Sequence, residues 1–185
     1  MRNTVGHDQV WQRLAGAVAR QQVHHAYLLA GPESIGKTTL ALDLAGLLLC
    51  QASAADKPCG VCAVCRRIAH GNHPDVTLVE AEEGKRLLGV EAVREAVVHM
   101  ANLAPSEGVW RVFIMPGVEN MTANTVNALL KTLEEPPPGV VLVLTSAEPE
   151  ALLPTLLSRC QLLPMQPLPG DLVVRALREH WQLAL

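Results

Sequence analysis

The chain has 185 residues, of which 49% are hydrophobic, and a formal net charge of -3. This composition excludes an intrinsically disordered protein, and no apolar run approaches the roughly 20 residues that cross a bilayer, so no membrane partner is expected. The weak negative charge gives no general attraction to nucleic acid, so contact with DNA would require a local patch or neighbouring subunits.

Short apolar segments alternate along the chain with segments of helical periodicity, which is the pattern of an α/β protein. Strands are expected at 26–30, 76–80, 111–115, 140–145 and, more weakly, 160–163, and helices at 7–21, 37–50, 90–103, 121–134 and 150–157. Apolar runs such as VVLVL favour a parallel sheet that is covered on both faces. We therefore predict a doubly wound sheet of five parallel strands with helices on both faces, which binds ligands at the carboxyl ends of its strands.

The segment GPESIGKT, from Gly31 to Thr38, matches the phosphate-loop pattern GxxxxGK[ST] between a predicted strand and a predicted helix. In such a loop, backbone N–H groups bind phosphate, Lys37 reaches the outer phosphates and the Thr38 hydroxyl ligates Mg²⁺. Ser34 stands where many such loops carry glycine, so its side chain is expected to crowd the phosphates. A chance match and a loop that has lost its nucleotide are the alternatives.

Four of the five cysteines are clustered, at Cys50, Cys59, Cys62 and Cys65. The first residues, MRNTVGHDQV, show no secretion signal, so we expect a cytoplasmic protein, in which clustered cysteines indicate a metal site. Four thiolates close a tetrahedron around Zn²⁺ and leave no open position for catalysis, which predicts a structural zinc module at about residues 50–70. Free thiols or a disulfide are the alternatives, and His70 and His73 are interpreted as surface or loop residues rather than ligands.

The strand predicted at 111–115 is followed by Pro116 and Gly117. In P-loop ATPases this strand end supplies an aspartate that orients the metal and a glutamate that activates water. Proline cannot ligate a metal or accept a proton and glycine has no side chain, so hydrolysis is not expected here. Glu119 lies further on and is interpreted as a carboxylate at a helix start, with a catalytic substitute as the alternative.

The tripeptide Ser158-Arg159-Cys160 precedes the last predicted strand. An arginine in this loop can reach a phosphate bound by another subunit, as arginine fingers do. A solvated surface charge is the alternative.

Several segments together resemble the clamp-loader branch of the AAA+ ATPases, and most closely the delta prime subunits of the bacterial DNA polymerase III clamp loader. They are VGHDQV, HHAYLLAGPESIGKTTLA, CGVCAVC followed by HPDV, VEAVREAV, and NALLKTLEEPPPGVVLVLTSAEPEALLPTLLSRCQ. The resemblance implies an AAA+ P-loop domain at 1–166 with an inserted zinc module, and the start of a truncated helical lid domain at 167–185. Since relatives assemble through a further helical collar, we expect this chain to be monomeric or weakly associating.

The resemblance also assigns roles to matching positions. It places Val5 and Gly6 near the adenine of ATP, and Thr145, or its neighbour Ser146, as a polar sensor at a strand end. Arg159 becomes a trans-acting finger that reaches the ATP of an adjacent motor subunit, and the four cysteines match the zinc module of the family. The implied phosphate loop comprises Gly31, Ser34, Gly36, Lys37, Thr38 and Thr39.

Motor subunits of the gamma/tau type keep the acidic pair, whereas delta prime subunits often have degenerate nucleotide sites. The resemblance therefore implies a stator subunit of the DNA polymerase holoenzyme, which supports ATP-dependent loading of the sliding clamp onto primed DNA. Its partners would be the gamma/tau and delta subunits, and ATP with Mg²⁺ would bind without effective turnover.

Three other functions are weighed against the stator. An active gamma/tau-type motor differs from it at Pro116 and Gly117. A zinc-ribbon nucleic-acid-binding module beside a relic P-loop is disfavoured by the 3% aromatic content and the lack of basic clusters near the cysteines. A small-molecule kinase would need arginines around its phosphates, and the spacings of this chain do not indicate them.

Overall fold

The computed structural model describes residues 2–79, 89–99 and 103–179 of the chain. Within them, five strands form one sheet in the order β2-β3-β4-β1-β5, and every neighbouring pair is parallel. The strands are β1 (Ala26–Ala30), β2 (Val76–Leu78), β3 (Arg111–Met115), β4 (Val140–Ser146) and β5 (Gln161–Pro164). The predicted five-stranded parallel sheet is confirmed, with β2 ending at Leu78 and residue 80 outside the described part.

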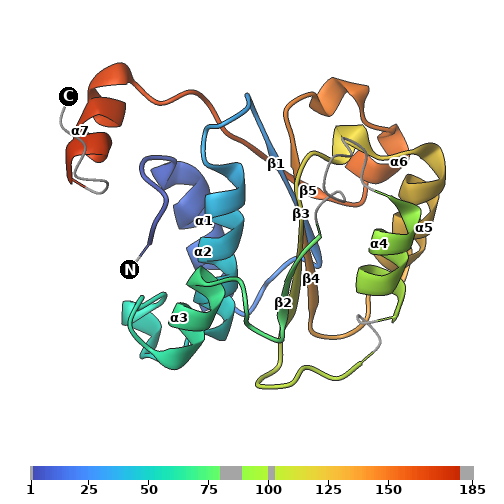
Figure 1. Ribbon diagram of the computed structural model, residues 1–185, viewed down its shortest axis with the longest axis horizontal. Helices are drawn as coiled ribbons and strands as arrows, with labels where there is room; N and C mark the ends of the chain where they lie inside the picture. Colours follow the sequence, from blue (N-terminus) through green and yellow to red (C-terminus); the bar gives the residue numbers. More distant parts are fainter. Residues whose placement is uncertain (1, 80–88, 100–102, 180–185) are drawn as a thin grey trace.

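Helices cover both faces of this sheet (Figure 1), with α1, α2 and α3 on one side and α4, α5 and α6 on the other. The helices are α1 (Asp8–Ala19), α2 (Lys37–Leu49), α3 (Ala63–Ala69), α4 (Val90–Val93), α5 (Ala123–Glu134), α6 (Pro154–Leu157) and α7 (Gly170–Glu179). Shorter turns are η1 (Ala54–Asp56), the π-helical η2 (Arg94–His99) that continues α4, η4 (Val118–Asn120) and η5 (Pro149–Ala151). The prediction of helices on both faces is therefore confirmed.

Two predicted helices differ from the structure. The segment 150–157 divides into η5 and α6, because Pro154 disfavours the helical conformation in the residue before it, and Leu153 is accordingly extended. Of the helix predicted at 90–103, the structure describes α4 and the π-helical η2 as far as His99; residues 100–102 lie outside the described part, and Leu103 is not helical. Val93 and Val97 of this segment are fully buried and belong to the core.

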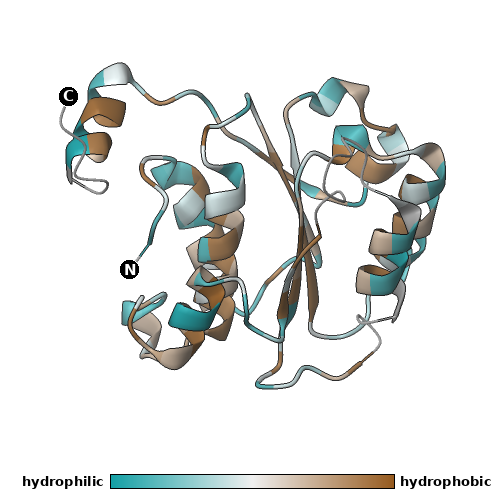
Figure 2. Cartoon of the chain, in the orientation of Figure 1, coloured by the Kyte–Doolittle hydropathy of each residue, from teal (hydrophilic) through white to brown (hydrophobic). Residues whose placement is uncertain are grey.

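The core explains why the central strands lack polar alternation. Along β1, Ala26 and Leu28 pack on the α5 side of the sheet, while Tyr27 and Leu29 pack on the α2 side. All residues of β4 are buried as well, and the central strands accordingly form the brown, hydrophobic centre of Figure 2. Both faces of these strands are removed from water, which makes a continuous apolar run favourable.

Because all strands are parallel, one edge of the sheet gathers the carboxyl ends of β1, β3 and β4. Ala30 lies opposite Ser146 and Met115 lies opposite Leu144 in the strand register. The loops after these strands therefore meet, and they include the phosphate-loop sequence. The opposite edge gathers the residues that precede the strands, and Arg159, just before β5, belongs to it.

The last described helix, α7, lies beyond the sheet on the side of α1, and the connection 165–169 joins it to β5 (Figure 1). Leu168 of this connection lies close to the N-terminal segment: a Cβ atom on Gly6 would stand 2.4 Å from its Cδ2. The division of the chain at residue 166 remains a prediction. No helix in the described ranges is long and apolar enough to span a membrane.

Candidate nucleotide and metal sites

The phosphate-loop sequence forms a loop between β1 and α2 that is fixed at its first residue. Gly31 donates its N–H to Ser146 O at 3.1 Å, and Met165 N bonds the preceding Ala30 O at 2.7 Å. A Cβ atom on Gly31 would lie 2.2 Å from the backbone oxygen of Met165, so only glycine fits here. The first residue of the loop is therefore packed between the end of β4 and the segment that follows β5.

The loop leads into α2, whose first N–H groups are available to an anion. Gly36 is the N-cap, and no side chain caps the helix. The first turn of a helix has N–H groups without intrahelical partners, and the helix dipole adds a partial positive charge. This N-terminus has the properties of a phosphate site.

Lys37 bends back over the loop in this structure. Its Nζ donates to Gly31 O at 2.7 Å and to Pro32 O at 2.6 Å. Burial lowers the pKa of Lys37, while Glu119 and Glu33 act in the opposite direction. The ammonium group thus bonds two neutral carbonyl groups that a phosphate could replace.

A cavity of about 460 Å³ opens between this loop and the ends of β3 and β4. Most of the residues expected to hold phosphate line it, together with Thr145, whereas Gly31 supports the loop from outside the cavity. The lining consists of Glu33, Ser34, Gly36, Lys37, Thr38, Thr39, Gly117, Glu119, Asn120, Thr145 and Ala147. Ser34 is exposed, with a φ of 59°, so the structure places it at the rim.

The end of β3 brings no carboxylate into this cavity, because Pro116 and Gly117 follow Met115. Glu119 enters instead from η4: its Oε1 accepts the N–H of Ala147 at 3.0 Å. Its Oε2 is shielded from solvent and has no hydrogen-bond partner in the described part of the chain. The residue does stand in the first turn of a short helix, yet its place in the cavity could not be read from the sequence.

Thr145, the residue predicted to be the polar sensor, is one of the residues that line this cavity. It is buried near the end of β4, lines the cavity, and its Oγ1 accepts the N–H of Gly117 at 3.3 Å. Ser146 differs, since its hydroxyl accepts the N–H of Glu148 at 3.0 Å. Of the two candidates, Thr145 is the one that faces the phosphate cavity.

A second, largely apolar cavity of about 490 Å³ lies on the other side of the loop. Ser34, Gly36 and Thr39 line both cavities, so the two adjoin across the phosphate loop. The remaining lining of the apolar cavity comes from the N-terminal segment, the loop, the connection before α7 and α7 itself: Asn3, Thr4, Val5, Ile35, Pro167, Leu168, Val173, Ala176 and Leu177. An apolar pocket next to a phosphate site suits a planar base.

The structure places Val5 in this pocket, whereas Gly6 packs behind it against Leu168. The apolar lining from the connection before α7 and from α7 itself was not expected from the sequence. The sequence of α7 does indicate an apolar face, because apolar residues recur in it at helical spacing: Leu172, Val173, Ala176 and Leu177.

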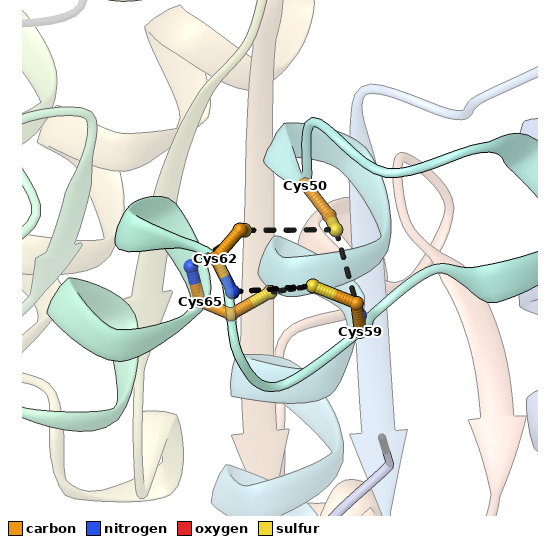
Figure 3. A group of neighbouring side chains, drawn as sticks. All are labelled: Cys50, Cys59, Cys62 and Cys65. Carbon is orange, nitrogen blue, oxygen red and sulfur yellow. Dashed lines mark hydrogen bonds between the residues drawn. The ribbon is translucent and has the colours of Figure 1, made fainter.

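The four clustered cysteines converge at the end of α2 (Figure 3). Their Sγ atoms all lie within 4.8 Å of one another, with 3.9 Å between Cys50 and Cys62 and 4.0 Å between Cys59 and Cys65. A tetrahedral Zn²⁺ with Zn–S bonds of about 2.3 Å requires sulfur atoms about 3.8 Å apart. All four are free thiols, so the donor set and spacing fit a structural zinc ion.

Backbone groups prepare this cluster for a cation. The Cys62 Sγ accepts the N–H of Cys65 at 3.4 Å, and the Cys59 Sγ accepts that of Cys62 at 3.3 Å. Burial opposes ionisation of the Cys62 thiol, but the N–H groups of Cys65 and Gln51 help to lower its pKa to about 6. Burial raises the pKa of Cys65 to about 12. A divalent cation would favour the thiolate form of all four.

The histidines near the cluster are not part of it. Among the described residues, the group of side chains that could hold a metal ion here consists of the four cysteines. His73 is buried elsewhere, where its Nδ1 accepts the N–H of Asp75 at 3.1 Å. The interpretation that four cysteines suffice agrees with this arrangement.

Arg159 lies at the edge of the sheet away from the phosphate loop, because it precedes β5 whereas the loop follows β1. Its guanidinium donates to Thr155 O at 2.8 Å and to Glu134 Oε1 at 2.7 Å. The side chain remains 32% exposed. Arg159 is thus separated from the loop of its own chain and accessible to another molecule.

The family model of the DNA polymerase III delta subunit matches residues 6–169. The chain belongs to this family. Among its relatives are DNA polymerase III subunit delta prime of Pseudomonas aeruginosa, 44% identical over 87% of this chain and 48% of that protein, and subunit delta prime of Escherichia coli, 37% identical over 89% and 49%. Subunit tau of Bacillus subtilis is 35% identical over 86% of this chain and 28% of its own length.

Solved structures agree with this family assignment at the level of the fold. A DNA polymerase III gamma subunit-related protein of Thermotoga maritima has a TM-score of 0.68 at 21% identity, over 95% of this chain and 52% of that one. The RuvB Holliday junction branch migration motor of the same organism has a TM-score of 0.61 at 18% identity, over 94% and 50%. The AAA+ P-loop fold is confirmed. The chain spans about half the length of the delta prime relatives.

Proposed function

We propose that this chain is the nucleotide-binding part of a clamp-loader stator, a delta prime subunit that supports ATP-dependent loading of the sliding clamp onto primed DNA. One relationship carries the proposal. The end of β3 offers no acidic pair beside the phosphate loop, while Arg159 stands accessible at the opposite edge of the sheet. A chain built in this way is suited to assist the ATP site of a neighbour rather than to hydrolyse its own ATP.

The roles of the residues follow from their positions. The N–H groups at the start of α2 bind phosphate, Lys37 exchanges its carbonyl partners for the outer phosphates, and the Thr38 hydroxyl is the ligand for Mg²⁺. Arg159 presents a planar guanidinium to the phosphates held by an adjacent gamma/tau subunit, where it stabilises developing negative charge. The delta subunit is the other expected neighbour.

The cysteine cluster has a structural role in this proposal. Zn²⁺ bound by four thiolates has no open position for a substrate. Cys50 at the end of α2, Cys59 and Cys62 in the loop and Cys65 in α3 would hold the ion, and the bound ion would supply a link between these elements. The module thus stabilises the fold and takes no part in the chemistry.

The test is reconstitution of the full-length subunit with its gamma/tau and delta partners, the clamp and primed DNA. We expect Arg159→Ala to lower ATP turnover by the complex roughly a thousandfold at one site, and Lys37→Ala to leave turnover nearly unchanged. Loss of turnover with Lys37→Ala would instead identify this chain as a motor. Unchanged turnover with Arg159→Ala would contradict the proposed action of Arg159 at the ATP site of a neighbouring subunit.

An active motor of the gamma/tau type remains the second candidate, and one observation favours it. Glu119 brings a carboxylate into the phosphate cavity although the strand end has none. Hydrolysis through Glu119 predicts that Glu119→Gln abolishes turnover at this site. The stator predicts no change, so the same reconstitution separates the two.

A further inference from the structure

The N-terminal segment is held to α2 by one carboxylate. Asp43 accepts the N–H of Asn3 at 2.9 Å through Oδ1, and at 3.1 Å through Oδ2. Its Oδ2 also accepts the N–H of Thr4 at 2.7 Å and the Thr4 hydroxyl at 2.5 Å. Residues 39 and 40 positions apart in the sequence are thereby joined at a single point.

Asp43 is only 3% exposed and lies in the middle of α2, in the otherwise apolar run LALDLAGLLL. A buried carboxylate is costly unless hydrogen bonds compensate for its lost hydration. Asn3 and Thr4 supply that compensation. In the described part of the chain, the hydrogen-bond partners given for this buried carboxylate all belong to the N-terminal segment.

The segment held in this way forms one wall of the apolar pocket. Asn3, Thr4 and Val5 all line the pocket, and the phosphate loop forms another wall. Arg2 holds the same turn from the outside, since its guanidinium donates to Thr4 O at 2.8 Å and to Gly6 O at 2.9 Å. The wall is thus fixed on both sides.

Asp43 also connects this wall to the phosphate site. Thr39 lies one helical turn before Asp43 on α2 and lines both the phosphate cavity and the apolar pocket. The helix α2, whose N-terminus borders the phosphate cavity, therefore also carries Asp43, the residue that holds the pocket wall. The distance between the two subsites is set within one rigid element.

We propose that Asp43 is a positioning residue for the base of the nucleotide: it holds the Asn3–Val5 wall at the distance from the phosphate loop that a bound nucleotide requires. This inference rests on the proposed nucleotide binding. In Asp43→Asn, one acceptor oxygen becomes an amide that donates, and it faces the donors of Asn3 and Thr4. The wall then loses its anchor while the phosphate loop keeps its own hydrogen bonds.

The experiment compares two ligands on the full chain by calorimetry with Mg²⁺: ATP, and inorganic tripolyphosphate, which has no base. We expect Asp43→Asn to weaken ATP roughly tenfold, as the loss of hydrogen bonds to a charged group suggests, and to change tripolyphosphate affinity less than about twofold. Asp56→Asn, an exposed aspartate outside both cavities, is the matched control and should change neither affinity.

A fall of both affinities by the same factor, in a variant that is still folded, would overturn the proposal because Asp43 would then act through the phosphate loop. Unchanged affinities would overturn it as well. If Asp43→Asn does not fold, Thr4→Val removes only the hydroxyl hydrogen bond and should still weaken the binding of ATP but not that of tripolyphosphate. If Thr4→Val shows no such selective loss, the proposal is contradicted. An unsubstituted chain that binds neither ligand refutes the proposed nucleotide binding, whereas equal affinity for both refutes the base pocket alone.

Discussion

Arg159 and Glu134 form an ion pair at the edge of the sheet where the strands begin, with 2.7 Å between Nη2 and Oε1. Glu134 ends α5, which starts near the phosphate cavity and returns along the sheet to this edge. The side chains are 32% and 50% exposed, so the pair contributes at most about 1 kcal/mol to stability. It holds the guanidinium in one orientation without removing it from reach.

Substitution of Arg159 by lysine tests whether this orientation matters. Arg159→Lys keeps the positive charge but loses the planar fork that binds two oxygens at once. We expect ATP turnover of the reconstituted complex to fall nearly as far as in Arg159→Ala, with the melting temperature of the subunit unchanged. Glu134→Gln is the companion variant, and its unfolding free energy should differ from that of the unsubstituted chain by no more than about 1 kcal/mol. Full turnover in Arg159→Lys would show that charge alone suffices.

Loss of one clustered thiol should abolish metal binding. Cys62→Ser leaves three thiolates, and we expect metal analysis to find about one zinc ion per chain before the change and none after it. The melting temperature should fall too, since binding energy of the ion is folding energy. Cys160→Ala is the control because Cys160 lies outside the cluster, and it should retain the ion. Equal zinc content in both variants would contradict the assignment.

Asp75 should make the fold sensitive to acid. Burial opposes ionisation of its carboxyl group, but the N–H groups of Ser106 and Glu107 and the Arg111 guanidinium lower its pKa. A carboxyl group whose pKa is lowered in the folded state stabilises the fold at pH values above its ordinary pKa of about 4. That contribution is lost as the pH falls through the lower pKa of the folded state.

Asp75→Asn removes this contribution. We expect the variant to lose about 3 kcal/mol of unfolding free energy at neutral pH, because a buried charge pair loses one partner. Its stability should then depend less on pH below about 4. Asp171→Asn, at an exposed helix start, should leave the acid transition where it was. An unchanged acid transition in Asp75→Asn would show that another group controls it.

Removal of the charge of Glu119 should strengthen phosphate binding in the stator. The carboxylate lies in the cavity that receives the phosphates, so without a metal ion its charge repels them. We expect Glu119→Gln to tighten ATP binding in the presence of EDTA by roughly three- to tenfold, measured by calorimetry. Weaker binding in Mg²⁺ together with unchanged binding in EDTA would show instead that Glu119 serves the metal.

The close approach at Gly31 predicts a large cost for a single methyl group. Because the new Cβ would meet a backbone oxygen at 2.2 Å, relief requires movement of the chain. We expect Gly31→Ala to lose at least about 2 kcal/mol in denaturant unfolding. Gly170→Ala is the control, since a Cβ there meets nothing within 4 Å, and it should cost no stability.

The sheet and most helices could be predicted because their signals are local. Fully apolar strands indicate burial on both faces, and the phosphate loop and the cysteine spacing are motifs whose flanking elements were also recognised. The break before Pro154 could have been anticipated from proline chemistry.

The parts that could not be predicted depend on contacts between distant segments. The direction of Glu119 is set by Ala147, 28 residues further on, and the bonds of Asp43 come from the N-terminal segment. The apolar pocket is formed by three segments whose proximity follows from the order of the strands rather than from any motif. Pattern and spacing identify which residues can act, whereas the topology decides which of them meet.

The phosphate loop and Arg159 lie at opposite ends of the strands, so the molecule presents two different surfaces to its neighbours. A contact that brings Arg159 of one chain to a phosphate loop of the next joins two different surfaces, so it is a heterologous contact rather than one built on a twofold axis. Repetition of such contacts produces a ring or a helix of subunits that all point in the same sense. Under the proposed function, a chain that presents Arg159 but does not hydrolyse its own ATP suits one end of an open series of subunits, where it acts on one neighbour.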